Sequence, residues 1–187
     1  HTAYRRQRQM CIRDRCRVFV ELDDYRPDVP GDDDPGRGRR IAFDVGKARI
    51  GVASCDPDCI LATPVETIHL KHYPWPQVTL QRIDSILTEY EPVEVIVGLP
   101  RTLHGRASSS VEMAIGFVDE FRTSWPKIPV RLVDERLSTV VATQALRSSQ
   151  VASRAQRALV DQAAAVEILN TWLDLRRRHC CHNEKEQ

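Results

Sequence analysis

From Arg40 onward the chain alternates between short apolar runs and longer segments with helical spacing. The runs IAFDV and RIGVASC lie on either side of Gly46 and Lys47, which predicts a hairpin of two strands. PVETIHL at residues 64–70 predicts a third strand, and VEVIVGL and residues 128–133 predict two more. Five strands are therefore expected, three of them consecutive.

Four other segments carry apolar residues at helical spacing. In residues 77–90 the side chains of Val78, Ile83, Ile86 and Leu87 can form one apolar face, and Pro92 ends the helix. Further helices are predicted at residues 108–124, 137–147 and 159–178. The predicted order is βββαβαβαα, which indicates an α/β fold with a mixed central sheet and helices packed on both faces.

The first forty or so residues differ from the rest and show no sustained periodicity. RRQRQMCIRDRCR is a basic run, and PDVPGDDDPGRGRR is rich in Pro, Gly and Asp. The basic run is a solvated tail, an arm for nucleic acid, or translated sequencing-adapter sequence without biological meaning. We expect a disordered or non-native extension at residues 1–39, one domain at 40–178 and a flexible tail at 179–187.

Charge and cysteine content narrow the class of protein. The formal net charge is +1, so any nucleic-acid site must be a local basic patch. No window approaches the roughly 18 apolar residues of a membrane span, and the basic N-terminus lacks the apolar part of a secretory signal. Cys55 and Cys59 have no CxxC spacing and no HxxxH partner, so zinc is not expected. The six cysteines fit a reduced, cytoplasmic protein without membrane contact.

Carboxylates occur at three places in the chain where apolar residues are expected. Asp44 lies inside a predicted central strand, where it is either a metal ligand or a cap for the turn at Gly46. Asp134 and Glu135 follow the apolar run VRLV at a strand end, where one of them could also start the next helix. Asp161 falls within the apolar stripe of the last helix; the alternative is a cap in its first turn or a pair with Arg157.

Carboxylates that meet in one place repel each other unless a cation lies between them. Mg²⁺ suits such a cluster because it prefers oxygen ligands and retains waters for substrate phosphates; Mn²⁺ is a second choice. Sites of this kind hydrolyse phosphodiester bonds. The pattern therefore predicts a metal-dependent nuclease.

Four segments resemble the YqgF/RuvX family of pre-16S rRNA nucleases, particularly its actinobacterial members. They are FDVGKARIGVASCDPDCILATPVETI, VIVGLPRTLHGRASS, VRLVDERLSTVVATQAL and VDQAAAVEILNTWLD, within residues 40–178. The resemblance implies an RNase H-like fold, related to Holliday-junction resolvases, and maturation of the 5′ end of 16S rRNA. It also implies that Asp44, Glu135 and Asp161 are the catalytic metal ligands. Resolvases tend to carry another acid where this chain has Ala164 and Ala165. The sequence therefore leaves open whether one or two metal ions bind.

Basic side chains lie within or beside the same motifs. Arg and Lys there would neutralise substrate phosphates, although ordinary surface charges look alike in sequence. The candidates are Lys47, Arg49, Arg101, His104, Arg106 and Arg136. The expected partner is nucleic acid, either pre-rRNA within a ribosomal precursor particle or branched DNA. A non-catalytic ribosome-assembly factor on the same fold is the third possibility.

Overall fold

The structure is a computed structural model, which describes residues 25–31, 33–70, 75–100, 109–134 and 154–183. Within the last helix, side chains are described for residues 161–179. The predicted helix at residues 137–147 lies outside the described residues.

A five-stranded mixed sheet forms the centre of the molecule. Its strands are β1 (Arg40–Val45), β2 (Arg49–Cys55), β3 (Ala62–His69), β4 (Glu94–Leu99) and β5 (Val130–Asp134). Their order is β3-β2-β1-β4-β5. The three consecutive strands pair antiparallel, whereas β4 is parallel to both β1 and β5. The predicted hairpin, with Val45 opposite Ile50, is confirmed.

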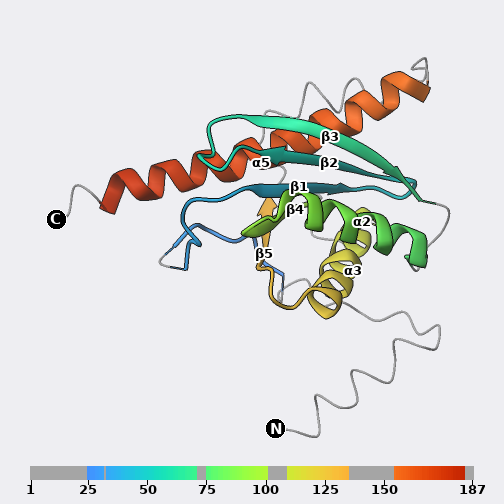
Figure 1. The fold of residues 1–187 in the computed structure, drawn as a ribbon, viewed down its shortest axis with the longest axis horizontal. Coiled ribbons are helices and arrows are strands. Elements are labelled where there is room, and N and C mark those ends of the chain that lie inside the picture. Colours follow the sequence, from blue (N-terminus) through green and yellow to red (C-terminus); the bar gives the residue numbers. More distant parts are fainter. Residues whose placement is uncertain (1–24, 32, 71–74, 101–108, 135–153, 184–187) are drawn as a thin grey trace, which may run out of the picture.

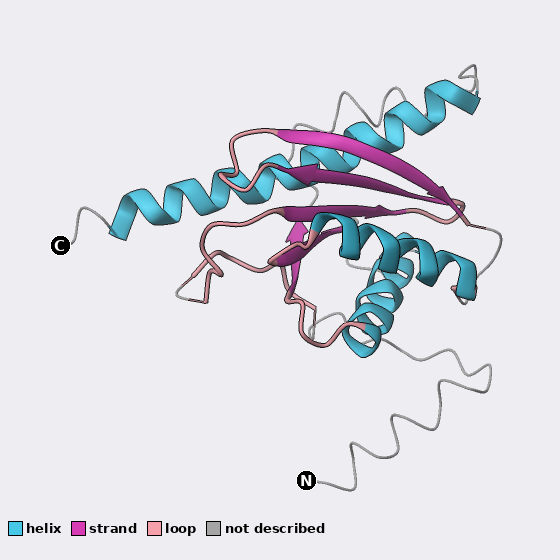
Figure 2. Cartoon of the chain, viewed as in Figure 1, coloured by secondary structure: helices cyan, strands magenta, loops and turns pink. Residues whose placement is uncertain are grey.

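Helices cover both faces of this sheet. Helices α2 (Gln77–Tyr90) and α3 (Ser109–Ser124) pack on one face, and the long helix α5 (Arg154–Asn183) crosses the other (Figures 1 and 2). Each face has its own apolar core: aromatic and branched side chains lie under α2 and α3, and smaller residues with Trp172 lie under α5. The predicted α/β class is confirmed, and the mixed sheet with this strand order is the RNase H-like arrangement. None of the described helices is long and apolar enough to span a membrane.

Helix α2 has the predicted bounds because proline lies close to each end. It follows Pro76 and ends at Tyr90, where Glu91 takes a left-handed conformation with φ of 45° and donates its N–H to the carbonyl of Leu87. Its predicted apolar face is wrong at one position. Val78 is 60% exposed, whereas Thr79 is buried with Ile83, Ile86 and Leu87. The first turn of α2 therefore turns Thr79 toward the sheet in place of Val78.

Part of the N-terminal segment packs along the sheet edge at β5. The amide of Asp28 donates to the carbonyl of Leu132 over 2.7 Å, and the Leu132 amide donates to the Asp28 carboxylate over 2.6 Å. The Tyr25 hydroxyl donates to Asp119 of α3. A disordered or non-native extension was expected at residues 1–39, whereas these bonds hold Tyr25 and Asp28 against α3 and β5. The division of the chain at residues 39 and 178 stays a prediction.

Buried charges join α5 to the starts of β1 and β4. The Arg40 guanidinium, fully buried, donates to Glu94 over 2.6 Å, and the indole N–H of Trp172 donates to the same carboxylate over 2.9 Å. Arg176 and Arg40 both pair with Asp34. This network fixes one end of α5 on the sheet.

Candidate active site

Asp44 is a buried carboxylate on the face of the sheet that α5 covers. Ile41, Phe43 and Val45 of β1 contribute to the core under α2 and α3, whereas Ala42 belongs to the core under α5. Because side chains alternate along a strand, Asp44 lies on the same face as Ala42. It is 8% exposed. A carboxylate held in a central strand at this burial requires favourable charged or hydrogen-bonding partners.

Asp161 meets the same part of the sheet from α5. Gly51 of β2 is the register partner of Asp44, and the backbone of Asp161 lies directly over Gly51. A Cβ atom on Gly51 would lie 2.7 Å from the Asp161 carbonyl carbon and closer still to its oxygen. The structure therefore brings Asp44 and Asp161 to two sides of one glycine.

The position of Asp161 within α5 excludes capping of the first turn as the reason for an acidic residue there. The helix begins at Arg154, two turns earlier, so Asp161 does not cap a first turn. The predicted start at residue 159 was late. The side chain of Arg157 lies outside the described ones, so the alternative pairing of Asp161 with Arg157 is not tested.

Arg49, at the start of β2, forms an ion pair with Asp161. Its Nε donates to Asp161 Oδ2, and the two side chains are 27% and 14% exposed. The pair places a cation beside a candidate metal ligand and directs Arg49 into the site. Lys47, in the turn between β1 and β2, is exposed.

Asp134 ends β5 on the other face of the sheet. Val130 and Leu132 contribute to the core under α2 and α3, whereas Val133 contributes to the core under α5. Alternation thus turns Asp134, 5% exposed, away from the face that holds Asp44.

Other predicted site residues lie outside the described part of the chain: Arg101, His104, Arg106, Glu135 and Arg136. The described residues contain no group of three or more acidic, His or Cys side chains suited to a metal ion.

Sequence reasoning identified the two acids but missed the residue that brings them together. An isolated glycine inside a strand, such as Gly51 in RIGVASC, often marks the close approach of another backbone. That signal could have predicted contact between this strand and a helix. The Arg49–Asp161 pair, whose members are separated by 112 positions, carries no comparable signal.

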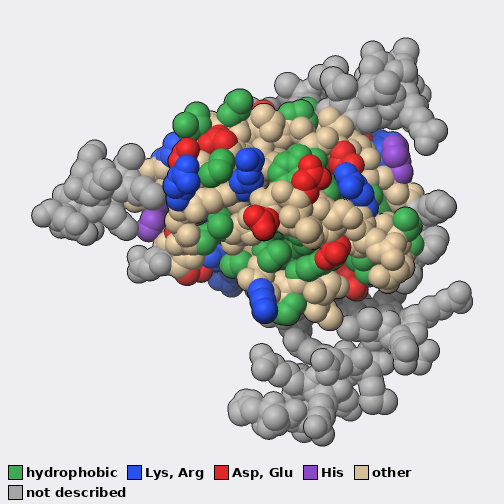
Figure 3. All heavy atoms as spheres, in the orientation of Figure 1, with side chains coloured by type: hydrophobic (Ala, Val, Ile, Leu, Met, Phe, Trp, Pro, Cys, Tyr) green, Lys and Arg blue, Asp and Glu red, His purple; other side chains and the backbone are tan. Residues whose placement is uncertain are grey.

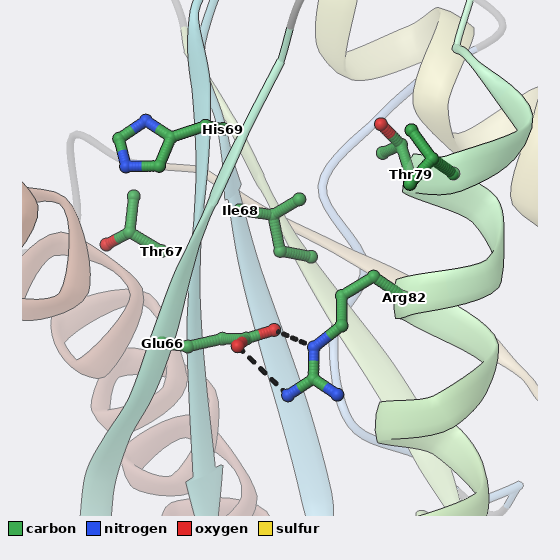
Figure 4. A pocket seen from close by; sticks show the side chains of 7 residues that line it. Glu66, Thr67, Ile68, His69, Thr79 and Arg82 are labelled. Atoms are coloured by element: carbon green, nitrogen blue, oxygen red, sulfur yellow. Dashed lines mark hydrogen bonds and ion pairs between the residues drawn. The ribbon is translucent and has the colours of Figure 1, made fainter.

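A hollow of about 310 Å³ lies elsewhere, between β3 and α2. Glu66 and Arg82 bridge it with two hydrogen bonds, Nε to Oε1 over 2.7 Å and Nη2 to Oε2 over 3.0 Å (Figure 4). None of the predicted site residues lines it. The face of the molecule shown in Figure 3 carries acidic and basic side chains interspersed, without a large area of one sign. Neither feature adds to the candidate site.

Comparison with known proteins gives consistent matches. The family described as "RuvX: Holliday junction resolvase" matches residues 38–175. A Rhodococcus erythropolis protein named "Putative pre-16S rRNA nuclease" is 57% identical over 153 residues, which cover 81% of this chain and 86% of the relative. A Mycolicibacterium smegmatis protein of the same name is 54% identical, covering 83% and 91%. Thermus thermophilus RuvC, solved with a Holliday junction substrate, is 17% identical with a TM-score of 0.46, covering 75% and 96%.

Proposed function

This chain belongs to the RuvX family, and from that premise we propose that it is a metal-dependent endonuclease that processes the 5′ end of pre-16S rRNA. The curated relatives that share more than half of their matched residues with it carry a name of this kind. We propose that it acts in the cytoplasm, on pre-rRNA within a ribosomal precursor particle.

One observation supports catalysis above all: Asp44 and Asp161 flank Gly51 on the face of the sheet under α5. Both side chains are largely buried, and they come from elements separated by more than a hundred residues. Carboxylates gathered on one face of a sheet repel each other unless a cation offsets their charge, and Arg49 supplies one for Asp161.

The residues present suit a hard divalent cation. Carboxylate oxygens are the ligands that Mg²⁺ prefers, with Mn²⁺ as an alternative, and the pairing of Asp161 with Arg49 indicates that a positive charge is favourable here. Asp44 and Asp161 would hold the ion, with Glu135 as the third ligand. Glu135 is proposed on the resemblance of VRLVDERLSTVVATQAL to the family motif, and it lies outside the described residues. A bound divalent cation would supply activation of water and stabilisation of the leaving oxygen.

The protein's own side chains would position the substrate. Arg49 already lies at the site, and Lys47 is exposed in the turn that precedes β2. Both would contact phosphates beside the scissile bond, with Arg101, Arg106 and Arg136 extending the basic surface. Their charges would favour binding of the polyanion, and the carboxylates would hold the divalent cation.

Branched DNA is the second candidate substrate. The description of the family that matches residues 38–175 favours it, because that description names a Holliday junction resolvase. Phosphodiester hydrolysis by the same carboxylates would serve both substrates, and the choice between them depends on recognition of the 2′-hydroxyl or of the junction shape.

The test compares cleavage of a pre-16S RNA fragment and a four-way DNA junction, each with Mg²⁺ or EDTA. We expect Mg²⁺-dependent cleavage of the RNA, abolished by Asp44→Asn. Asp58→Asn is a matched control, because this exposed carboxylate lies in the turn at the opposite end of β2. Cleavage of the junction alone would favour the second substrate. Binding without cleavage, unchanged by Asp44→Asn, would contradict an enzyme and indicate a non-catalytic assembly factor.

A further inference from the structure

Two free cysteines face each other at the end of the sheet remote from Asp44. Cys55 is the last residue of β2, and Cys59 closes the turn that follows. Their Sγ atoms are 4.0 Å apart, and the side chains are hydrogen-bonded to each other. A disulfide has an Sγ–Sγ distance of about 2 Å, so the two sulfur atoms must approach by roughly a further 2 Å to form one.

The turn between the two cysteines holds them in this arrangement. The Asp56 carboxylate accepts hydrogen bonds from the amides of Asp58, Ile60 and Leu61, at 2.7 to 3.0 Å. The Cys59 amide donates to the Asp56 carbonyl, and Cys59 itself has φ of 60°. Because a left-handed cysteine is unfavourable on its own, the surrounding bonds must impose it.

A buried cation faces the thiol of Cys59. Arg40 Nη1 donates to Cys59 Sγ over 2.9 Å, and the Arg40 amide donates to Cys55 Sγ over 3.3 Å. The hydrogen bond from Cys55, with the charges of Arg40 and Arg176, lowers the pKa of Cys59 to about 6 against the opposing effect of burial. The same thiol–thiol bond, together with burial, raises the pKa of Cys55. Cys59 is also the more accessible of the two, 6% exposed against 1%.

We propose that Cys55 and Cys59 are a reversible oxidation site, which hydrogen peroxide converts into an intramolecular disulfide. The Cys59 thiolate attacks one peroxide oxygen, which forms a sulfenic acid and, with a proton from solvent, releases the other oxygen as water. The sulfur of Cys55 then attacks the sulfenic sulfur, and the second water leaves with the thiol proton. The two thiols lose two electrons, which the peroxide gains. The oxidation site is separate from the proposed nuclease site. Arg40, which contacts both cysteines, is the first residue of β1, whereas Asp44 lies near the other end of that strand.

The test uses the full-length reduced protein, treated with hydrogen peroxide, alkylated and digested with trypsin. Residues 50–71 form one tryptic peptide that contains Cys55 and Cys59, whereas Cys11, Cys16, Cys180 and Cys181 fall in other peptides. We expect this peptide to lose two hydrogen atoms and both alkylation sites, and dithiothreitol to restore them. A peptide that stays doubly alkylated, or that carries a sulfinic acid without a disulfide, would overturn the proposal.

Two serine variants test the order of the steps. In Cys55→Ser we expect peroxide to leave a sulfenic acid at Cys59 that dimedone traps. In Cys59→Ser we expect no dimedone adduct at Cys55. A double variant of Cys180 and Cys181 to serine is the matched control and should leave the oxidation of residues 50–71 unchanged. Trapping at Cys55 alone would overturn the assigned roles, and circular dichroism confirms that each variant is folded.

Discussion

Gly51 of β2 lies in direct contact with the peptide carbonyl of Asp161 in α5. Strand and helix approach so closely here that no side chain fits between them. The contact sets the height of α5 above the sheet at the level of Asp44, the register partner of Gly51. The packing of two backbones therefore determines how far apart the two candidate metal ligands lie.

We predict that Gly51→Ala separates α5 from the sheet and impairs the site. The added Cβ would lie 2.7 Å from the Asp161 carbonyl carbon, and neither backbone can move without disturbing its neighbours. We expect a loss of about 1–3 kcal/mol in the free energy of unfolding, measured with urea, and a larger proportional loss of Mg²⁺-dependent cleavage. Gly31→Ala is the control, because its Cβ would meet nothing closer than 3.7 Å. Equal effects of the two substitutions would contradict this explanation.

Glu94→Ala is predicted to be among the most destabilising substitutions. Glu94 is 1% exposed and accepts hydrogen bonds from Arg40, Arg131 and Trp172. Its removal leaves the fully buried Arg40 guanidinium without its nearest carboxylate, so we expect a loss of about 3–5 kcal/mol.

The matched control for this prediction is Glu66→Ala. Glu66 also pairs with an arginine, but that pair lies at the surface, where Arg82 is 45% exposed. Screening by water limits the expected loss to about 0–1 kcal/mol. Urea unfolding of both variants measures the difference, and similar losses would mean that the burial of Glu94 is unimportant.

The elements of the fold could be predicted where local signals are strong. Helix α2 has the predicted bounds because Pro76 and Pro92 restrict the backbone on either side. The hairpin of β1 and β2 follows from two β-branched runs separated by a short polar turn. Helix α5 was expected to begin five residues later than it does, since helix ends carry weak signals.

The candidate site was predictable only in part, because its geometry depends on distant residues. A carboxylate inside an apolar strand or stripe stands out in sequence, which identified Asp44 and Asp161. Their meeting at Gly51, and the pairing of Arg49 with Asp161, depend on how α5 crosses the sheet. The role of Glu135 as third ligand stays a prediction.

Asp34 is predicted to make stability sensitive to acid. Burial alone would raise the pKa of Asp34, but the hydrogen bonds from Arg176 and the Gly36 amide, and the charges of Arg176 and Arg40, hold it below its ordinary value of 3.8. A carboxyl whose pKa is lower in the folded state stabilises the protein above the unfolded pKa, and this stabilisation is lost as pH falls through the folded pKa. In Asp34→Asn we therefore expect a shallower fall in the unfolding free energy below pH 3.8. Parallel acid profiles for the two proteins, in urea titrations at each pH, would refute this role.

Arg49 is predicted to compete with the metal ion for Asp161. Its guanidinium pairs with the carboxylate that would bind Mg²⁺, so a bound cation must displace the arginine or share the carboxylate with it. In Arg49→Ala we expect the dissociation constant for Mg²⁺, obtained from the rise of the unfolding temperature with Mg²⁺ concentration, to fall about fivefold, which corresponds to a partly exposed pair of about 1 kcal/mol. Lys47→Ala is the matched control, because Lys47 is an exposed cation in the neighbouring turn. If Arg49→Ala instead requires more Mg²⁺, the arginine supports the metal-bound state, and the competition is disproved. Because thermal stabilisation is measured without substrate, this result is independent of any role that Arg49 has in binding phosphate.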